Sequence, residues 1–344
     1  MRTPAVWRRA RLVLICATAL GCGAERRASA DAATDSAVAS DAPLTVFAAG
    51  SLARPMRAAL DSFSARSGIS YTLESAGSLE LARRLTDLGK RADIVALADE
   101  EVFPRLLMPA HGTWYARFAR NRLVLAHAVN ATGLAEAQRG EWRTVLQRPA
   151  VEVGRADPDL DPAGYRTLML FQLAERYYSE PGLAARLETT APRRHVRPKS
   201  AELVALLQAN ELDYAWMYES SARGARLPFI ALAPEIDLGD ERYAATYTPA
   251  VVRVLGSTVA DTLELRGVPI RYGLTIPREA PQPARAVAFL RVLLSPDGTR
   301  VLRQESLDAL DAPLVVGEGA PAFLDSLSAL PAVAPAVAPA PARH

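Results

Sequence analysis

The sequence predicts an α/β fold built as two lobes with a ligand cleft between them. Strand-like and helix-like patterns alternate from residue 44 onwards, which favours mainly parallel sheets covered by helices. Two of the expected strands are followed by the same residues, Ala-Gly-Ser, which lead directly into a helical pattern. About 290 residues form the folded part, and a long insertion separates two similar halves, which is typical of two lobes around a cleft.

The first residues are typical of an export signal. Residues 1–21 hold four arginines and no acidic residue, with an apolar run that is too short for a membrane-spanning helix of about 20 residues. The run ALGC that ends at Cys22 resembles a bacterial lipobox, in which Cys22 is acylated and becomes the mature N-terminus. Cleavage near Ala-Ser-Ala at 28–30 is the alternative. We therefore expect an extracytoplasmic, periplasmic protein that is anchored to a membrane as a lipoprotein.

Both ends of the chain differ in composition from its centre. Residues 22–43 are rich in Ala, Ser and Asp and are expected to form a flexible linker, whereas residues 331–344 form a Pro/Ala-rich tail that is expected to be disordered. Between them, lobe 1 is assigned to residues 44–126 and 246–330, and lobe 2 to residues 127–245.

The expected elements follow from hydrophobic periodicity. Short apolar runs predict strands, longer amphipathic stretches predict helices, and glycines at 68 and 89 mark the ends of the first two helices. The expected strands are 44–48, 71–74, 94–97, 123–126, 151–154, 214–218, 229–232, 251–255 and 272–276. The expected helices are 52–66, 79–89, 100–107, 142–147, 164–178, 200–209, 283–294 and 296–304.

Charge and motif content exclude several classes of protein. The net charge of +2 includes the four arginines of residues 1–21, and no cluster of basic residues indicates a nucleic-acid partner. The only cysteines are Cys16 and Cys22, so the mature chain has neither a disulfide nor a thiolate metal site. No serine-nucleophile elbow, metal-binding histidine pair or phosphate-binding loop is present. We therefore expect a protein without catalytic activity.

The two Ala-Gly-Ser junctions are the candidate binding elements. The first amides of a helix are unpaired and the helix dipole is positive there, so each junction suits an anion. Ser51 and Ser78 each follow a glycine, which lets a ligand approach the backbone closely. The alternative is that each serine only caps its helix. Two identical junctions 27 residues apart favour convergence on one small ligand.

A third candidate is the loop before the expected helix 164–178. Asp157, Asp159 and Asp161 suggest a calcium loop, but two prolines and the lack of a closing glutamate spoil its spacing. Asp161 is otherwise expected to cap the helix, with Pro162 at the first helical position, which aims backbone amides into the cleft. An exported metal-dependent enzyme that uses these aspartates is the alternative from a different class of protein.

Several segments together resemble one family. In order and spacing, residues 44–305 closely resemble the periplasmic tungstate- and molybdate-binding proteins of ABC transporters, especially the archaeal-type tungstate binders. The segments are LTVFAAGSL, ESAGSLELARRLTDLGKRADIVALAD, MPAHGTWYARFARNRLVLAH, DPDLDPAGYRTLMLFQLAERYY, RPKSAELVALLQANELDYAWMYESSA and IRYGLTIP. The resemblance implies a type II periplasmic-binding-protein fold, with two α/β lobes on a two-stranded hinge that close over one oxyanion. It also implies a monomeric receptor without a cofactor, which hands tungstate or molybdate to a permease and its ATPase.

The resemblance also implies a set of ligand contacts from both lobes. Archaeal-type members add two carboxylates to the metal; Asp161 matches one and is a candidate direct ligand to tungsten or molybdenum. Ser200 stands where the second, a glutamate, is expected, so four-coordinate binding through hydrogen bonds is the alternative. The implied contacts are Gly50, Ser51 and Ser78 in lobe 1, and Asp161, Pro162, Ala163, Ser200 and Tyr218 in lobe 2.

The residue types also agree with an oxyanion. A fully ionised tetrahedral dianion offers only acceptors, so hydroxyls and backbone N–H groups suit it. A receptor for sulfate or phosphate is the alternative within the same fold class. Phosphate would tolerate an acceptor such as Asp161 for its remaining proton.

Overall fold

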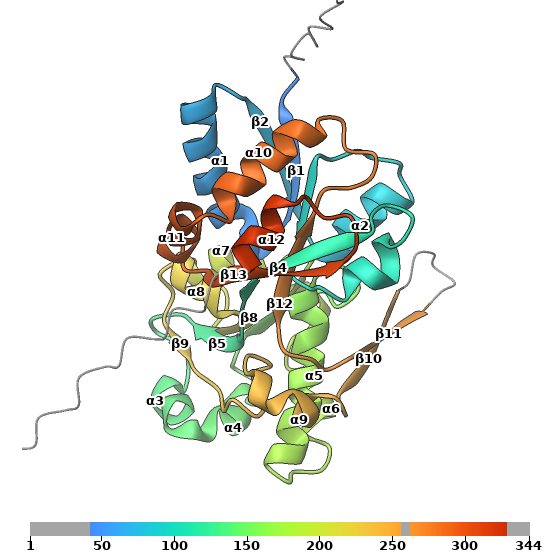
Figure 1. Cartoon of the computed structure of the whole chain (residues 1–344). Helices are drawn as coiled ribbons and strands as arrows, with labels where there is room; N and C mark the ends of the chain where they lie inside the picture. The colour runs from blue at the N-terminus through green and yellow to red at the C-terminus, as the bar shows by residue number, and fades with distance from the viewer. Residues whose placement is uncertain (1–41, 256–261, 329–344) are drawn as a thin grey trace, which may run out of the picture. The chain divides into compact units, whose positions relative to one another are not determined.

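The β-strands form two larger sheets and one separate pair (Figure 1). This computed structural model describes residues 42–255 and 262–328. The first sheet has six strands in the order β13-β4-β12-β3-β1-β2, and the second has five in the order β7-β6-β8-β5-β9. The first sheet consists of β1 (Leu44–Ala49), β2 (Tyr71–Ala76), β3 (Ile94–Leu97), β4 (Trp114–Arg120), β12 (Arg271–Thr275) and β13 (Asp308–Gly317). The other strands are β5 (Leu123–His127), β6 (Val153–Ala156), β7 (Val196–Arg197), β8 (Tyr214–Tyr218) and β9 (Phe229–Ile230), and the pair β10 (Val251–Leu255) and β11 (Thr262–Arg266).

Both sheets are mixed, so the expectation of mainly parallel sheets is wrong. β1 pairs in parallel with β2 and β3, and β6 with β7 and β8, because helices carry the chain back between these strands. The other pairs are antiparallel: β12 with β3 and β4, β4 with β13, and β5 with β8 and β9. The reason is that the chain leaves the first sheet after β4 and returns to it at β12, running opposite to β3.

Helices cover both sheets. α1, α10 and α11 pack against one another beside the first sheet (Figure 1), and Phe63 of α1 meets Phe289 of α10 edge to face, with ring centroids 5.3 Å apart. α5 packs on β6 and β8 of the second sheet. The α-helices are α1 (Ala53–Ser67), α2 (Ser78–Thr86), α3 (Leu134–Glu136), α4 (Trp142–Leu146), α5 (Pro162–Tyr177), α6 (Leu183–Thr189), α7 (Ser200–Gln208), α8 (Glu219–Gly224), α9 (Ala244–Tyr247), α10 (Pro283–Leu293), α11 (Pro296–Gln304) and α12 (Phe323–Ser328). The other helical turns are η1 (Gly50–Leu52), η2 (Phe103–Leu107), η3 (Ala137–Glu141), η4 (Arg193–His195) and η5 (Glu241–Tyr243).

The chain changes sheet earlier than the expected lobe boundary at residue 126. β5 belongs to the second sheet, so the change comes between Arg120 and Leu123. The pair β10–β11 stands apart from both sheets beside α5, where the Gln172 side chain donates to the Val251 carbonyl at 2.8 Å and accepts from its N–H at 3.0 Å. Both sheets belong to one compact unit of the chain. The exact division into two lobes stays a prediction.

The register of the first sheet brings the two Ala-Gly-Ser junctions together. β1 and β2 are parallel neighbours, with Ala49 opposite Ala76. Since neighbouring strands lie about 4.8 Å apart, the two Gly-Ser pairs that follow leave the sheet side by side. β3, the other parallel neighbour of β1, ends at Leu97, so Ala98 leaves the sheet at the same edge.

The core of the second sheet follows the two-residue period of β8. Trp216 and Tyr218 face one side, where the Trp216 ring packs edge to face on Trp142 with ring centroids 5.5 Å apart. Met217 faces the other side, in a smaller apolar cluster that includes Leu203 of α7. All of β8 is therefore buried, and its last residue, Tyr218, is held rigidly.

Two strands of the first sheet have no counterpart among the expected elements. β4 carries arginines at 117 and 120 within an apolar run, and β13 contains Pro313, which weakens a strand pattern. Most other expected elements are present with small shifts at their ends. The described helices include none that is both long enough and apolar enough to cross a membrane. The expected signal with Cys22 and the expected Pro/Ala tail lie outside the described residues.

Candidate functional site

The serines of the two Ala-Gly-Ser junctions are not helix caps. The turn η1 precedes α1, whose cap residue is Leu52, and no side chain caps either element through a hydrogen bond. α2 begins at Ser78 itself, with Gly77 in the cap position. The interpretation of Ser51 and Ser78 as capping residues is therefore wrong. Both hydroxyls have other partners.

The Ser78 hydroxyl is buried at the edge of the first sheet. Its Oγ accepts a hydrogen bond from the backbone N–H of Ala98, at a distance of 2.9 Å. A backbone N–H can only donate, so the Ser78 hydroxyl proton is left for another acceptor. Within the described part of the chain, no such acceptor is bonded to it.

The Ser51 hydroxyl is bonded to a tyrosine on a distant strand. Its Oγ lies 2.8 Å from the hydroxyl of Tyr272 in β12. The same Tyr272 hydroxyl accepts a hydrogen bond from Nδ2 of Asn121 at 2.8 Å. Burial raises the pKa of Tyr272 to about 12, so its phenol is protonated at neutral pH. The position of Ser51 is therefore fixed by Tyr272 of β12, which is in turn bonded to Asn121, the residue that follows β4.

Asp161 joins the starts of two helices in the second sheet's half of the molecule. It is the cap residue of α5, with Pro162 at the first helical position, as predicted. Its Oδ1 accepts from the N–H of Ala163 and its Oδ2 from the N–H of Ser200, both at 2.9 Å. Burial raises the pKa of Asp161, although these N–H groups oppose the shift. The carboxylate thus fixes the start of α7 against the start of α5.

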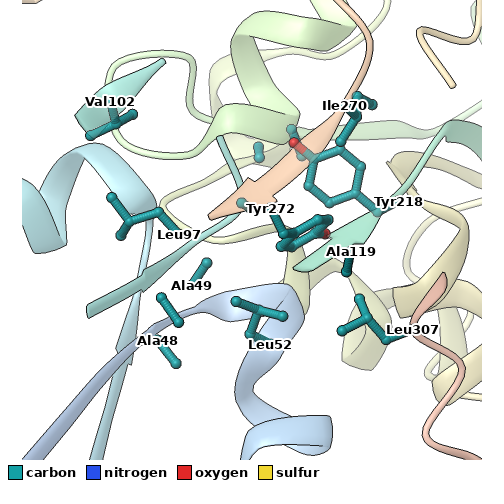
Figure 2. Close-up of a cluster of buried hydrophobic side chains, with 14 of the residues drawn as sticks. Ala48, Ala49, Leu52, Leu97, Val102, Ala119, Tyr218, Ile270, Tyr272 and Leu307 are labelled. Atoms are coloured by element: carbon teal, nitrogen blue, oxygen red, sulfur yellow. The ribbon is translucent and has the colours of Figure 1, made fainter. Parts of the chain in front are cut away.

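Tyr218, at the end of β8, is bonded to a buried arginine. Its hydroxyl accepts a hydrogen bond from Nη1 of Arg166 at 2.8 Å. Burial raises the pKa of Tyr218 well above its usual value, although the arginine charge opposes this. The centre of its ring lies 6.0 Å from that of Tyr272, and Figure 2 shows the two rings next to each other. Tyr218 therefore links the second sheet to the Ser51 junction.

Arg166 is a site residue that the sequence analysis missed. It is 2% exposed, donates from Nη1 to the Ala98 carbonyl at 2.6 Å, and pairs through Nη2 with Asp99 at 2.9 Å. Burial lowers the pKa of its guanidinium, but the Asp99 carboxylate together with the Tyr218 and Tyr165 hydroxyls raises it by more, so Arg166 stays charged. Its position in the sequence could have indicated this role, because Arg166 lies four residues after Pro162 and therefore on the same face of α5.

The two halves of the site touch through backbone atoms. A Cβ on Gly77 would lie 1.9 Å from the Leu160 carbonyl oxygen, so only a glycine allows this approach. On the other junction, a Cβ on Gly50 would lie 4.0 Å from Cβ of Lys199. Nη1 of Arg83 in α2 also donates to the Asp159 carbonyl at 3.0 Å. The structure thus brings together all the predicted site residues: Gly50, Ser51, Ser78, Asp161, Pro162, Ala163, Ser200 and Tyr218.

The three aspartates of the loop before α5 do not converge. Asp157 accepts from the N–H of Asp159 at 2.9 Å, and Asp159 accepts from the N–H of Leu255 at 2.8 Å. Asp161 accepts from the two helix starts described above. Across residues 42–255 and 262–328, no group of three or more His, Cys, Asp or Glu side chains is arranged to hold a metal ion. The loop therefore gives no support to a metal-dependent enzyme.

Solved structures share this architecture. The periplasmic molybdate-binding protein of Azotobacter vinelandii matches with a TM-score of 0.53 over 77% of this chain and 98% of that protein, at 13% identity. The sulfate-binding protein SubI of Mycobacterium tuberculosis matches with a TM-score of 0.52 over 78% of this chain and 87% of that protein, at 16% identity. These identities support the fold alone. The fold is that of the periplasmic binding proteins, as predicted.

The sequence relatives are closer. Residues 44–305 match the family described as bacterial extracellular solute-binding protein, and the chain belongs to this family. A solute-binding protein of Petrotoga mobilis is 36% identical over 271 residues, 78% of this chain and 84% of the relative. The molybdate/tungstate-binding protein WtpA of Pyrococcus abyssi is 35% identical over 303 residues, 80% of this chain and 87% of the relative. The predicted resemblance to molybdate and tungstate binders is confirmed.

Proposed function

We propose that the protein is an extracytoplasmic receptor that captures tungstate or molybdate and delivers it to the permease of an ABC transporter. The carrying observation is that two buried hydroxyls accept hydrogen bonds from groups that can only donate. Ser78 accepts from the Ala98 N–H, and Tyr218 accepts from the Arg166 guanidinium. Each hydroxyl therefore keeps its own proton for a ligand. A fully ionised oxyanion, which offers only acceptors, is the ligand that suits them.

The charges around the proposed site largely cancel, which supports a ligand that is held mainly by neutral hydrogen-bond donors. The Arg166 charge is matched by Asp99, so the pair adds little net charge. Nη2 of Arg166 lies within ion-pair distance of Asp99 but makes no aligned hydrogen bond among the described residues. A buried donor without an aligned acceptor is costly. We propose that an oxyanion oxygen lies within reach of this donor.

The opposing wall of the proposed site is the pair of helix starts held by Asp161. The Ser200 hydroxyl, which also lies within hydrogen-bond reach of Asp161, is the proposed donor to the ligand there, because the N–H groups of Ala163 and Ser200 already donate to Asp161. Pro162 and Ala163 shape the wall. Each Asp161 oxygen accepts one N–H, and the Ser200 hydroxyl is a further partner of this carboxylate, so direct ligation of a metal would use a remaining lone pair. A crystal structure with tungstate separates the two modes. An oxygen-to-metal distance of about 2 Å means direct ligation.

A titration of ligand-induced stabilisation tests the proposal. Tungstate and molybdate are expected to raise the melting temperature of the purified protein at micromolar concentrations, whereas sulfate and phosphate are expected to require far higher concentrations. Sulfate is also fully ionised, so its rejection rests on its smaller size. Stabilisation by sulfate or phosphate alone assigns the alternative receptor function. No stabilisation by any of the four oxyanions contradicts the proposal.

Ser51→Ala and Ser78→Ala are each expected to weaken tungstate binding about 10- to 100-fold, because each removes a hydrogen bond to a charged ligand. Ser51→Ala is expected to lower the melting temperature of the ligand-free protein by no more than a few degrees, because Ser51 caps no helix but is a hydrogen-bond partner of the buried Tyr272 hydroxyl. Ser78→Ala is expected to lower it by a few degrees, because the buried Ala98 N–H loses its acceptor. Isothermal titration and thermal unfolding measure both effects. Wild-type affinity in both variants would remove these serines from the site.

The cellular setting belongs to the same proposal. We propose a monomeric lipoprotein, anchored through Cys22 on the periplasmic side, that acts without catalysis or cofactor and presents its ligand to the permease and ATPase. The basic and apolar pattern of residues 1–21 supports export, and ALGC supports acylation. Closure of the two halves over a ligand is the state that a permease can distinguish.

A further inference from the structure

We infer that Asn121 sets the direction of the hydrogen bonds that reach Ser51 and so selects oxyanions that carry no proton. The inference rests on the proposed function and assigns a positioning role to Asn121 and Tyr272. Neither residue is among the predicted ligand contacts. Asn121 lies between β4 and β5, where the chain passes from one sheet to the other, and is 7% exposed.

The orientation of the Asn121 amide is fixed by two backbone groups. Its Oδ1 accepts from the N–H of Arg122 at 3.0 Å and from the N–H of Ser220 at 3.3 Å. Because both groups can only donate, the atom that faces them must be the oxygen. Nδ2 therefore faces the other way. It donates to the Ser220 hydroxyl at 2.7 Å and to the Tyr272 hydroxyl at 2.8 Å.

A fixed amide fixes the next two protons. The Tyr272 oxygen accepts from Asn121, and its other bonded partner is the Ser51 Oγ, 2.8 Å away. Either hydroxyl could donate in that bond, and we assign the donor to Tyr272, because Asn121 Nδ2 cannot accept and Ser51 then gives the phenol proton an acceptor. Burial keeps the phenol protonated, since it raises the pKa of Tyr272 to about 12. Ser51 then accepts from Tyr272, and its own proton is left for another acceptor. The order Asn121 to Tyr272 to Ser51 makes the serine a donor.

The consequence for the ligand is a requirement for an acceptor. An oxygen of tungstate or molybdate accepts the Ser51 proton. A P–OH group of monohydrogen phosphate at the same place would bring two donors, the Ser51 hydroxyl and the P–OH group, face to face without an acceptor. With Ser78 and Tyr218 oriented in the same sense, a protonated oxyanion finds few acceptors along this wall. Discrimination by protonation adds to discrimination by size.

Asn121→Asp reverses the direction of the relay and tests the inference. The new carboxylate oxygen in place of Nδ2 takes the Tyr272 proton, so Tyr272 accepts from Ser51 and Ser51 presents lone pairs to the ligand. Tungstate binding is expected to weaken at least about tenfold, and the ratio of tungstate to phosphate affinity to fall by a similar factor. Calorimetry with sodium tungstate and with inorganic phosphate at pH 8 measures both.

Two further variants separate the effect of hydrogen-bond direction from the effect of the added negative charge and from a failure to fold. Ser221→Asp adds the same charge on α8, in the groove that also contains Ser51, but does not enter the relay. It is expected to weaken both dianions alike and to leave their ratio unchanged. Tyr272→Phe breaks the relay without a charge and is expected to lower the ratio about threefold to tenfold, which keeps the inference testable if Asn121→Asp does not fold.

The outcomes distinguish this inference from the proposed function. A wild-type protein that binds none of the oxyanions contradicts the proposed function. A wild-type protein that binds tungstate, with equal losses in Asn121→Asp and Ser221→Asp, overturns the role of Asn121, because charge alone then accounts for the effect. An unchanged affinity ratio in Tyr272→Phe overturns it as well.

Discussion

Replacing Gly77 by alanine is expected to weaken tungstate binding about 10- to 100-fold, because the added methyl overpacks the contact between the two halves of the site. The new Cβ would lie 1.9 Å from the Leu160 carbonyl oxygen and 2.6 Å from its carbon. These are backbone atoms that cannot rotate away, so the second Ala-Gly-Ser junction and the Asp161 loop would be held apart. Isothermal titration with sodium tungstate measures the loss.

The ligand-free Gly77→Ala protein is expected to unfold within a few degrees of the wild-type temperature, because the two halves of the site can move apart to relieve the overpacked contact. Gly77 has φ −64° and ψ 149°, which alanine adopts without strain. Gly112→Ala is the matched control, because its Cβ would meet nothing closer than 3.8 Å and it lies outside the site. Near-wild-type affinity of Gly77→Ala would show that the approach of Leu160 is not needed for binding.

Arg166→Met is expected to destabilise the protein by about 3–5 kcal/mol, since it leaves a buried carboxylate without its cation. Asp99 is 2% exposed and would retain only the hydrogen bond from Tyr165 and its local contacts. Tungstate binding is expected to weaken as well, because Tyr218 loses the donor that orients its hydroxyl. Chemical denaturation and titration measure the two effects separately.

A second substitution separates these two roles of Arg166. Asp99→Asn in the Arg166→Met background removes the unpaired charge and keeps an acceptor for Tyr165, so most of the lost stability is expected to return. Tungstate affinity is expected to stay low, because Tyr218 still lacks its donor. A double variant that is as unstable as Arg166→Met would contradict the charge argument. A double variant that binds like the wild type would remove Arg166 from the orientation of Tyr218.

The parts of the site that depend on local sequence were predictable. Asp161 caps α5 with Pro162 behind it, because both residues have strong preferences for these positions. Ser51 and Ser78 were found through their shared Ala-Gly-Ser pattern, and the parallel pairing of β1 and β2 explains why that pattern repeats. The interpretation of the serines as caps was wrong, because the cap residue of α1 is Leu52, one residue after Ser51, and the cap residue of α2 is Gly77, one residue before Ser78.

The residues behind the hydroxyls were not predictable in the same way. Tyr272 lies 221 positions from Ser51, and Asn121 lies 151 positions from Tyr272, so only the tertiary fold brings them together. Arg166 reads as one more charged residue of a helix until its burial against Asp99 is known. The prediction of mainly parallel strands was wrong for a related reason. Helix-to-strand alternation does not reveal that the chain leaves the first sheet and returns to it reversed.

The alignment of Ala49 with Ala76 limits where the chain can change length. One residue inserted or deleted within β1 or β2 would move its serine by about 3.3 Å along the strand and turn the following side chains to the opposite face. One hydroxyl would then leave the site, and in β1 the buried side chains would be turned over as well. Insertions or deletions between the end of α1 and the start of β2 are not expected to have this effect, because they leave the pairing of β1 with β2 unchanged. Length changes that preserve ligand capture are therefore expected outside these two strands.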